Sequence, residues 1–129
     1  MENFSYLCVV NILSTMDKPL YNVILSEEVR EFLKGLPQKA VKKILYNIHI
    51  VAGGHQDKEL FKKLDNTDIW EFRTLYMGVA YRLLAFWDTE SHALIITTHG
   101  FIKKTTKTPK KEIEKADTLR KEYFKNKTN

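Results

Sequence analysis

The first half of the chain combines one short β-type run with two amphipathic segments. Leu20–Leu25 is rich in β-favouring side chains and is predicted to be a strand. Ser26 is placed to cap the following helix, whose apolar positions recur at helical spacing until Gly35. A second helix is predicted from Pro37, a residue suited to a first turn, to the glycine pair at 53–54.

After residue 69 the apolar positions alternate as they do in strands. Residues 69–76 and 79–87 are predicted to be two strands joined by a compact turn at Met77 and Gly78. Residues 92–101 follow a second turn signal and are predicted to be a third antiparallel strand.

The last helix is predicted to begin with Thr108 as its N-cap and Pro109 as its first helical residue. The complete order is then β-α-α-β-β-β-α. This order predicts an α+β domain in which helices pack on a mainly antiparallel, twisted sheet.

Residues 1–17 do not fit this pattern. Their apolar patch, Tyr6–Leu13, is short, has no basic residue before it and lacks a small-residue cleavage site, which argues against a signal peptide. Met16 stands directly before the first convincing structure. We therefore expect residues 1–17 to be a dispensable N-terminal extension and residues 18–129 to form a single domain, in keeping with a length of 129 residues.

Composition narrows the class of protein. A hydrophobic fraction of 43% is enough for a globular core, and no apolar run approaches the ~18–20 residues of a membrane span. The single cysteine, Cys8, cannot form an internal disulfide, which suits a reducing compartment. We expect a cytoplasmic protein without a membrane partner.

The positive charge collects near the C-terminus. The formal net charge is +5, and residues 101–129 hold ten Lys or Arg against four Asp or Glu, whereas residues 1–100 hold eleven against twelve. Basic patches of this kind attract polyanions such as nucleic acid. A solvated helix face has the same composition, so charge alone leaves both interpretations open.

Most enzyme chemistries find no support in the sequence. The four histidines show no metal-ligand spacing, and one cysteine excludes a thiolate cluster. There is no glycine-rich phosphate loop and no local signature of a Ser-His-Asp or Cys-His site. We therefore expect neither a metal nor a cofactor, and cations remain as the candidate chemical groups.

Two arginines lie in the middle of neighbouring predicted strands. If the hairpin pivots on Met77 and Gly78, Arg73 and Arg82 lie nearly opposite each other and repel by roughly a few tenths of a kcal/mol. An anion between or beside them would make this arrangement tolerable. The alternative is that each arginine pairs with a carboxylate such as that of Glu71.

Further donors converge on the same side of the predicted sheet. Lys62 and Lys63 enter the sheet shortly before the hairpin, and a dense group follows the third strand, namely Lys103, Lys104, Thr105, Thr106, Lys107 and Thr108. Guanidinium forks, ammonium groups and the N–H donors of a helix N-terminus together suit a phosphodiester. The sequence therefore predicts a phosphate-binding cradle at this junction.

The segments IWEFRTLYMGVAYRLLAFW and THGFIKKTTKTPKKEIEKA resemble the phage-derived Gp49/HigB-like branch of the RelE/ParE superfamily of toxins. The resemblance extends from about Tyr21 to Phe124, and its most specific part is the His-Gly-Phe-x-Lys-Lys-Thr-x-Lys-Thr-Pro motif. It implies a RelE-like microdomain and the toxin of a type II toxin–antitoxin pair. The implied partners are a HigA-like helix-turn-helix antitoxin, the ribosome and messenger RNA.

Members with RelE activity cut messenger RNA in the ribosomal A site without a metal, using the RNA's own 2′-hydroxyl as the nucleophile. By resemblance, Arg73 and Arg82 stabilise the charge of the transition state. Lys103 and Lys104 belong to a lysine cluster in which mutual repulsion lowers the pKa, so that one can transfer protons near neutral pH. The RNA-binding candidates are Lys62, Lys63, Phe101, Thr105, Lys107 and Lys110.

Two of these residues have a structural interpretation of equal standing. His99 matches the motif histidine and can transfer protons, yet strand alternation places it on a face with Ile95 and Thr97. Phe101 can stack on a base or pack in the core. Two other functions also stay open, a gyrase-inhibiting toxin of the same fold and a nucleic-acid-binding module without catalysis.

Overall fold

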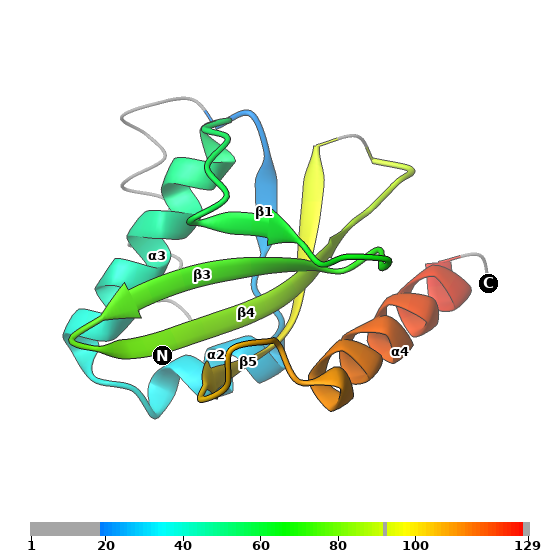
Figure 1. Ribbon diagram of the computed structural model, residues 1–129. Coiled ribbons are helices and arrows are strands. Elements are labelled where there is room, and N and C mark those ends of the chain that lie inside the picture. Colours follow the sequence, from blue (N-terminus) through cyan, green and yellow to red (C-terminus); the bar gives the residue numbers. More distant parts are fainter. Residues whose placement is uncertain (1–18, 92, 128–129) are drawn as a thin grey trace.

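The computed structural model describes residues 19–91 and 93–127. The predicted extension, residues 1–17, and the first residue of the predicted third strand, His92, lie outside them. The elements in chain order, drawn in Figure 1, are β1 (Asn22–Ile24), α2 (Glu27–Lys34), α3 (Gln38–Ala52), β2 (Phe61–Lys63), β3 (Trp70–Tyr76), β4 (Val79–Trp87), β5 (Leu94–Lys103) and α4 (Lys110–Lys127).

The strands form one sheet in the order β1-β5-β4-β3-β2. β1 runs parallel to β5, and the other three pairs are antiparallel. The predicted α+β class with a mainly antiparallel sheet is therefore confirmed. β2 was not predicted, because a three-residue strand is too short to show alternation and is defined only by its pairing with β3.

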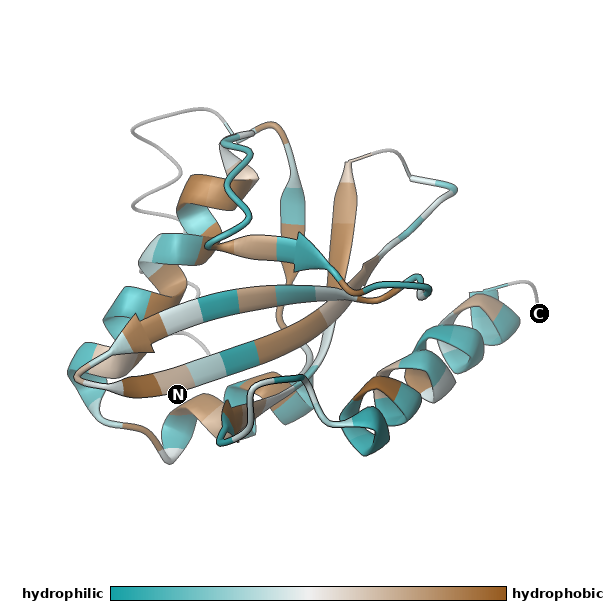
Figure 2. Ribbon diagram, viewed as in Figure 1, coloured by the Kyte–Doolittle hydropathy of each residue, from teal (hydrophilic) through white to brown (hydrophobic). Residues whose placement is uncertain are grey.

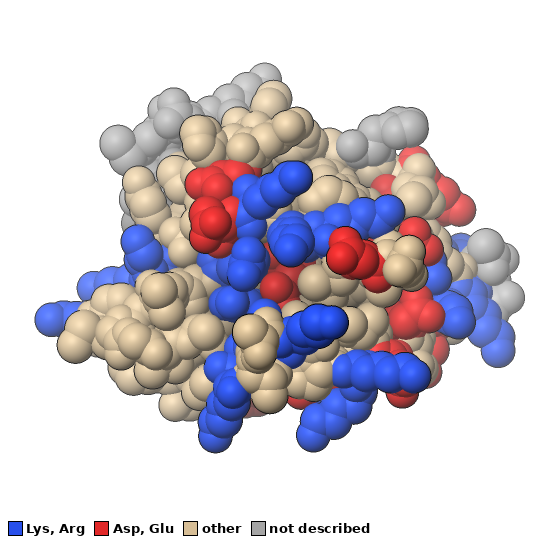
Figure 3. All heavy atoms as spheres, in the orientation of Figure 1, with Lys and Arg blue, Asp and Glu red and all other residues tan. Residues whose placement is uncertain are grey.

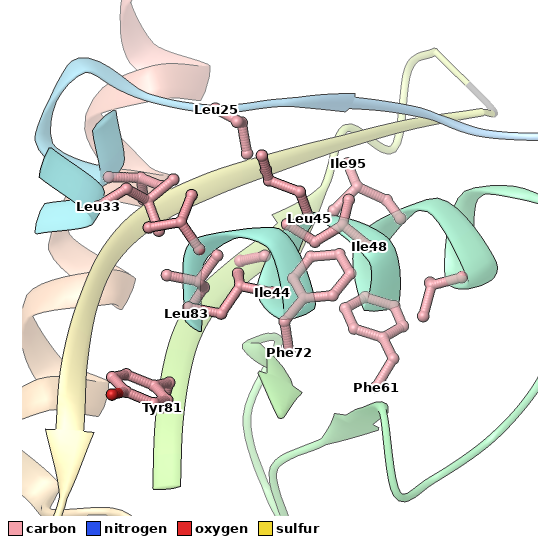
Figure 4. Close-up of a cluster of buried hydrophobic side chains, with 14 of the residues drawn as sticks. Leu25, Leu33, Ile44, Leu45, Ile48, Phe61, Phe72, Tyr81, Leu83 and Ile95 are labelled. Carbon is pink, nitrogen blue, oxygen red and sulfur yellow. The ribbon is translucent and has the colours of Figure 1, made fainter. Parts of the chain in front are cut away.

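The helices lie on both faces of the sheet. α2 and α3 cover one face and enclose the main core, whose larger side chains Figure 4 shows. α4 lies on the other face over a smaller apolar cluster that includes Leu84, Phe86 and Ala116. Hydrophobic and hydrophilic residues alternate along β3 in Figure 2, whereas successive apolar residues of β4 and β5 divide between the two cores.

Two predicted local signals are realised in the structure. The hydroxyl oxygen of Ser26 accepts the N–H of Val29 at 3.0 Å and caps α2. Met77 and Gly78 both have positive φ, 51° and 76°, as a two-residue hairpin turn of the type that matches strand twist requires. The β3–β4 hairpin therefore pivots where the sequence predicted, and Arg73 lies directly opposite Arg82.

β5 contains a bulge that the sequence pattern did not reveal. Leu84 pairs with His99 but Ala85 pairs with Thr97, so Thr98 is an extra residue in the strand. Alternation shifts by one position there. The side chain of Thr97 bonds the backbone carbonyl of Ile24 beside α2, whereas His99 bonds Glu112 on α4. The predicted shared face of His99 with Ile95 and Thr97 was therefore wrong.

Candidate functional site

A hollow of about 410 Å³ opens on the α4 side of the sheet, beside β2 and β3 and against the segment that joins β5 to α4. Figure 3 shows Lys and Arg side chains gathered over the centre of this face, with acidic side chains among them. The lining consists of Lys62, Leu64, Asp65, Glu71, Arg73, Lys103, Thr106, Lys107, Thr108 and Ile113. We call it the cationic hollow.

The carboxylate of Glu71 is the centre of the site. Its side chain is only 2% exposed, and its Oε1 lies 3.6 Å from Nε of Arg73 and 3.4 Å from Nε of Arg82. Its Oε2 accepts the hydroxyl of Thr108 at 2.5 Å. Glu71 is thus the carboxylate that the pairing alternative named. One acid does not balance two guanidinium groups, so the local charge remains positive.

The two arginines are held by their own strands and loops. Arg73 donates from Nη1 to the carbonyl of Lys58 at 3.2 Å, and Arg82 donates from Nη1 to the carbonyl of Tyr81 at 3.1 Å. The Nε of each arginine is buried and lies at ion-pair distance from Oε1 of Glu71, without the geometry of a hydrogen bond. Each guanidinium group is thus held by a backbone carbonyl and by the Glu71 carboxylate.

Lys103 has a lowered pKa. Burial is the largest cause, Glu71 opposes it, and the positive charges of Arg82, Arg73 and Lys62 lower it further. The sequence predicted a lowered lysine pKa from crowding among lysines, whereas burial and the arginines contribute more here. The neutral amine of Lys103 is therefore more accessible than that of an ordinary lysine, which is a requirement for proton transfer near neutral pH.

Thr108 is not the N-cap of α4. Its hydroxyl donates to Glu71, and the carbonyl of Pro109 accepts the N–H of Ile113 at 3.3 Å, so α4 begins one residue later than predicted. The prediction of a cap followed from the position of the threonine before a proline and an amphipathic run. In the fold Thr108 ties the junction segment to β3 and closes one side of the hollow.

The structure brings only some of the predicted site residues together. Arg73, Lys103, Lys62 and Lys107 line the hollow, and Arg82 lies beneath it against Glu71. Lys104 and Thr105 are exposed in the junction segment, where the hydroxyl of Thr105 donates to the carbonyl of Lys107. Lys110 is also exposed, and its Nζ lies 3.9 Å from Glu114. Lys63 pairs with Trp70 and therefore lies on the opposite face of β2 from Lys62.

His99 and Phe101 occupy the core rather than the hollow. His99 is buried beneath α4, with Nε2 3.0 Å from Glu112 and Nδ1 3.1 Å from the hydroxyl of Thr98. Burial lowers the pKa of His99, against the opposing effect of its hydrogen bond to Glu112. Phe101 packs against the smaller core. Their surroundings match the structural interpretation of both residues.

Glu71 was absent from the predicted site residues, although one signal pointed to it. An acid in the middle of an apolar strand, two residues from Arg73, shares a face with that arginine. Nothing in the sequence showed that Thr108 would approach it from 37 residues away.

A known protein family matches most of the chain. The family described as phage-derived protein Gp49-like matches residues 31–121, which cover β2 to β5, all of α3, half of α2 and most of α4. The chain belongs to this family. No curated protein matches the chain.

The resemblance seen in the sequence is thereby confirmed at the level of the family, and the α+β fold is consistent with a RelE-like one. In the part of the chain that the structure describes, no helix is long and apolar enough to cross a membrane. Over the same residues, no group of three or more His, Cys, Asp or Glu side chains is placed to hold a metal ion.

Proposed function

We propose that this Gp49-like protein is the toxin of a type II toxin–antitoxin system and that it cleaves messenger RNA on the ribosome without a metal. Two observations support the proposal, membership of the Gp49-like family and the charge arrangement of the cationic hollow. The proposed partners are ribosome-bound messenger RNA and a helix-turn-helix antitoxin.

The reaction is an internal transfer of the phosphate. The 2′-oxygen of the RNA forms a new bond to phosphorus, and the bond from phosphorus to the 5′-oxygen of the next nucleotide breaks. The products are a 2′,3′-cyclic phosphate and a free 5′-hydroxyl. Charge builds up on the phosphoryl oxygens in the transition state, and Arg73 and Arg82 are the preorganised cations that stabilise it.

Protons must also move in this reaction. The 2′-hydroxyl loses one and the leaving 5′-oxygen gains one. Lys103 is the proposed proton-transfer group, because it lines the hollow and its lowered pKa brings its neutral form closer to the working pH. Glu71 is a positioning residue, since it lies beside both guanidinium groups and bonds the junction segment through Thr108.

The observation that carries the proposal is the placement of Arg73, Arg82 and Lys103 around one buried carboxylate. A solvated basic surface has no reason to bury arginines at a carboxylate, because exposed cations bind polyanions equally well. The buried, tethered arrangement costs stability and provides fixed geometry. Stabilising a transition state requires fixed geometry, whereas simple phosphate binding does not.

The test is single-turnover cleavage of messenger RNA on purified ribosomes with the full chain, followed by analysis of the new ends. We expect breaks that carry a 2′,3′-cyclic phosphate and a 5′-hydroxyl. RNA binding without breaks would instead indicate a binding module. Growth arrest accompanied by DNA-damage signalling, with intact messenger RNA, would indicate a gyrase inhibitor.

The antitoxin is tested separately. Its gene is expected beside the toxin gene, and co-expression of the two should restore growth, because an acidic or helical segment that covers the cationic hollow neutralises it. Normal expression of both proteins without rescue would contradict this pairing.

A further inference from the structure

A second hollow lies where β3 begins and β4 ends, next to the C-terminal half of α4. We propose that it binds an unpaired nucleotide of the same RNA, next to the phosphate held in the cationic hollow. The proposal rests on the proposed RNA substrate and adds a binding subsite to it. The second hollow has a volume of about 540 Å³, and its lining is Lys63, Asp68, Trp70, Trp87, Thr89, Arg120, Lys121 and Phe124.

Three of the lining residues are aromatic. Trp70 and Trp87 are partly exposed and lie at right angles to each other, with ring centroids 6.2 Å apart and an interplanar angle of 84°. Phe61 stacks against Trp70 at 4.8 Å and so restricts its movement. Partly exposed indoles held in this way are platforms for nucleobases, because every base has a face that can stack on them.

Three other lining residues are cations. Lys63 lies directly opposite Trp70 in the β2–β3 pair, while Arg120 and Lys121 come from α4. Asp117 pairs with both α4 cations, at 3.0 Å from Nε of Arg120 and 3.1 Å from Nζ of Lys121. Asp68 lies 3.7 Å from Nη2 of Arg120. Ion pairs at the protein surface are weak, so a phosphate can compete for the cations. An aromatic wall beside such cations suits single-stranded RNA.

The second hollow lies beside the first along α4. β2 lies between the two sites, since its adjacent lysines point to opposite faces of the sheet, Lys62 toward the cationic hollow and Lys63 toward the second one. α4 contributes to both as well, through Ile113 and Arg120, which are about 10 Å apart along the helix axis. In Figure 1 the β2–β3 turn reaches toward α4, and Asp68 of this turn pairs with Arg120. A distance of this size suits neighbouring nucleotides of one strand.

The two tryptophans make the subsite directly measurable, because the chain contains only two. The probe is a short single-stranded RNA whose 2′-hydroxyls are methylated, so that it cannot be cleaved, titrated into the full chain. We expect saturable quenching of tryptophan fluorescence. The variant Lys63→Ala/Lys121→Ala should bind the RNA roughly five- to tenfold more weakly, and its salt slope should be smaller by about 0.7 for each phosphate that is no longer neutralised.

Two control variants sharpen the measurement. Lys42→Ala removes an exposed charge from α3, outside the lining of either hollow, and should bind like the parent. The tryptophans also line a separate cavity with His55. His55→Ala alters that cavity alone and should leave the quenching unchanged. Circular dichroism checks that every variant is folded.

The outcomes separate this subsite from the proposed function. Quenching by RNA together with an absence of cleavage on ribosomes would support the subsite and overturn the nuclease. Cleavage on ribosomes without quenching, or unchanged RNA affinity in Lys63→Ala/Lys121→Ala, would overturn the subsite and leave the nuclease intact. Quenching by an acidic peptide but not by RNA would also overturn it, and would make this hollow a protein-docking site.

Discussion

Arg73 and Arg82 face each other directly across the β3–β4 pair, with the buried carboxylate of Glu71 within 3.6 Å of Nε in both. Two features of this arrangement matter for the site. The like charges are placed where they repel, and the acid that reduces their repulsion is also bonded to the segment before α4. The cationic hollow is therefore a single unit, and its members are expected to respond together to substitution.

Replacing Arg73 with Ala should slow cleavage by ~10²–10³, because the transition state is then deprived of a preorganised positive charge. The side chain is 26% exposed, so the fold should survive. Single-turnover cleavage on ribosomes measures the rate. Lys42→Ala, which removes an exposed lysine from the opposite face, is the matched control and should cut at the parent rate. A folded Arg73→Ala protein with the parent rate would reduce the hollow to a binding surface.

Glu71→Gln should lower the free energy of unfolding by on the order of 3 kcal/mol, because the two arginines are then without their buried counter-charge. The amide keeps the size of the side chain and can still accept the bond from Thr108. Urea denaturation measures the change. Combining it with Arg82→Gln should cost less than the sum of the two single changes, because the repulsion is then removed as well. Additive effects would show that Glu71 and Arg82 are not coupled.

Lys62→Ala should move the pH–rate profile to higher pH. Lys62 is one of the charges that lower the pKa of Lys103, and its removal raises that pKa. If Lys103 acts as a base, the rising limb moves to higher pH, and if it acts as an acid, the falling limb does. Rates at saturating protein separate this shift from weaker RNA binding. A profile that Lys62→Ala leaves in place would assign the proton transfer to another group.

His99 should make stability depend on pH in a narrow range. Burial holds its folded-state pKa below the ordinary value of 6.5, despite the opposing bond to Glu112. At a pH between the folded-state pKa and the unfolded-state pKa, the unfolded chain binds more protons than the folded one. Stability therefore decreases as pH falls below about 6.5. Comparing urea midpoints of the parent and His99→Gln from pH 7 downward measures this decrease. Identical slopes in both proteins would show that His99 does not contribute.

Gly100→Ala should destabilise the fold by about 1–3 kcal/mol through overpacking. A Cβ at position 100 would lie 2.4 Å from a ring carbon of Phe32 and 2.7 Å from a methyl carbon of Leu83. Gly35→Ala is the control, because a Cβ there meets nothing closer than 3.7 Å. Thermal unfolding of the two variants tests the contrast. Equal stability would mean that α2 moves away from β5 at little cost.

The elements that the sequence predicted are those with strong local signals. The cap at Ser26 and the turn at Met77 and Gly78 depend on residues close together in the chain, so their side chains and dihedral angles are enough to specify them. The hairpin turn also sets the register of Arg73 against Arg82. The core of the candidate site was predictable for this reason.

The elements that the sequence missed depend on distant partners. β2 is a strand only because β3 pairs with it, and the Thr98 bulge exists only in the register of β5 against β4. That bulge turns His99 away from the predicted face and into the contact with Glu112. A single extra residue reverses alternation beyond it, and no local pattern reveals such a residue.

By itself the sequence determined the fold class, the order of most elements, the resemblance to the family and the cations of the junction, because local propensity, alternation and a continuous motif carry them. Only the tertiary structure decided which cations share a site. It placed Glu71 between two arginines and brought Thr108, in the segment between β5 and α4, into contact with it. It also directed Lys62 and Lys63 to different hollows. Charge and hydrogen bonding act through space, so their partners are fixed by the packing of strands and helices rather than by position in the chain.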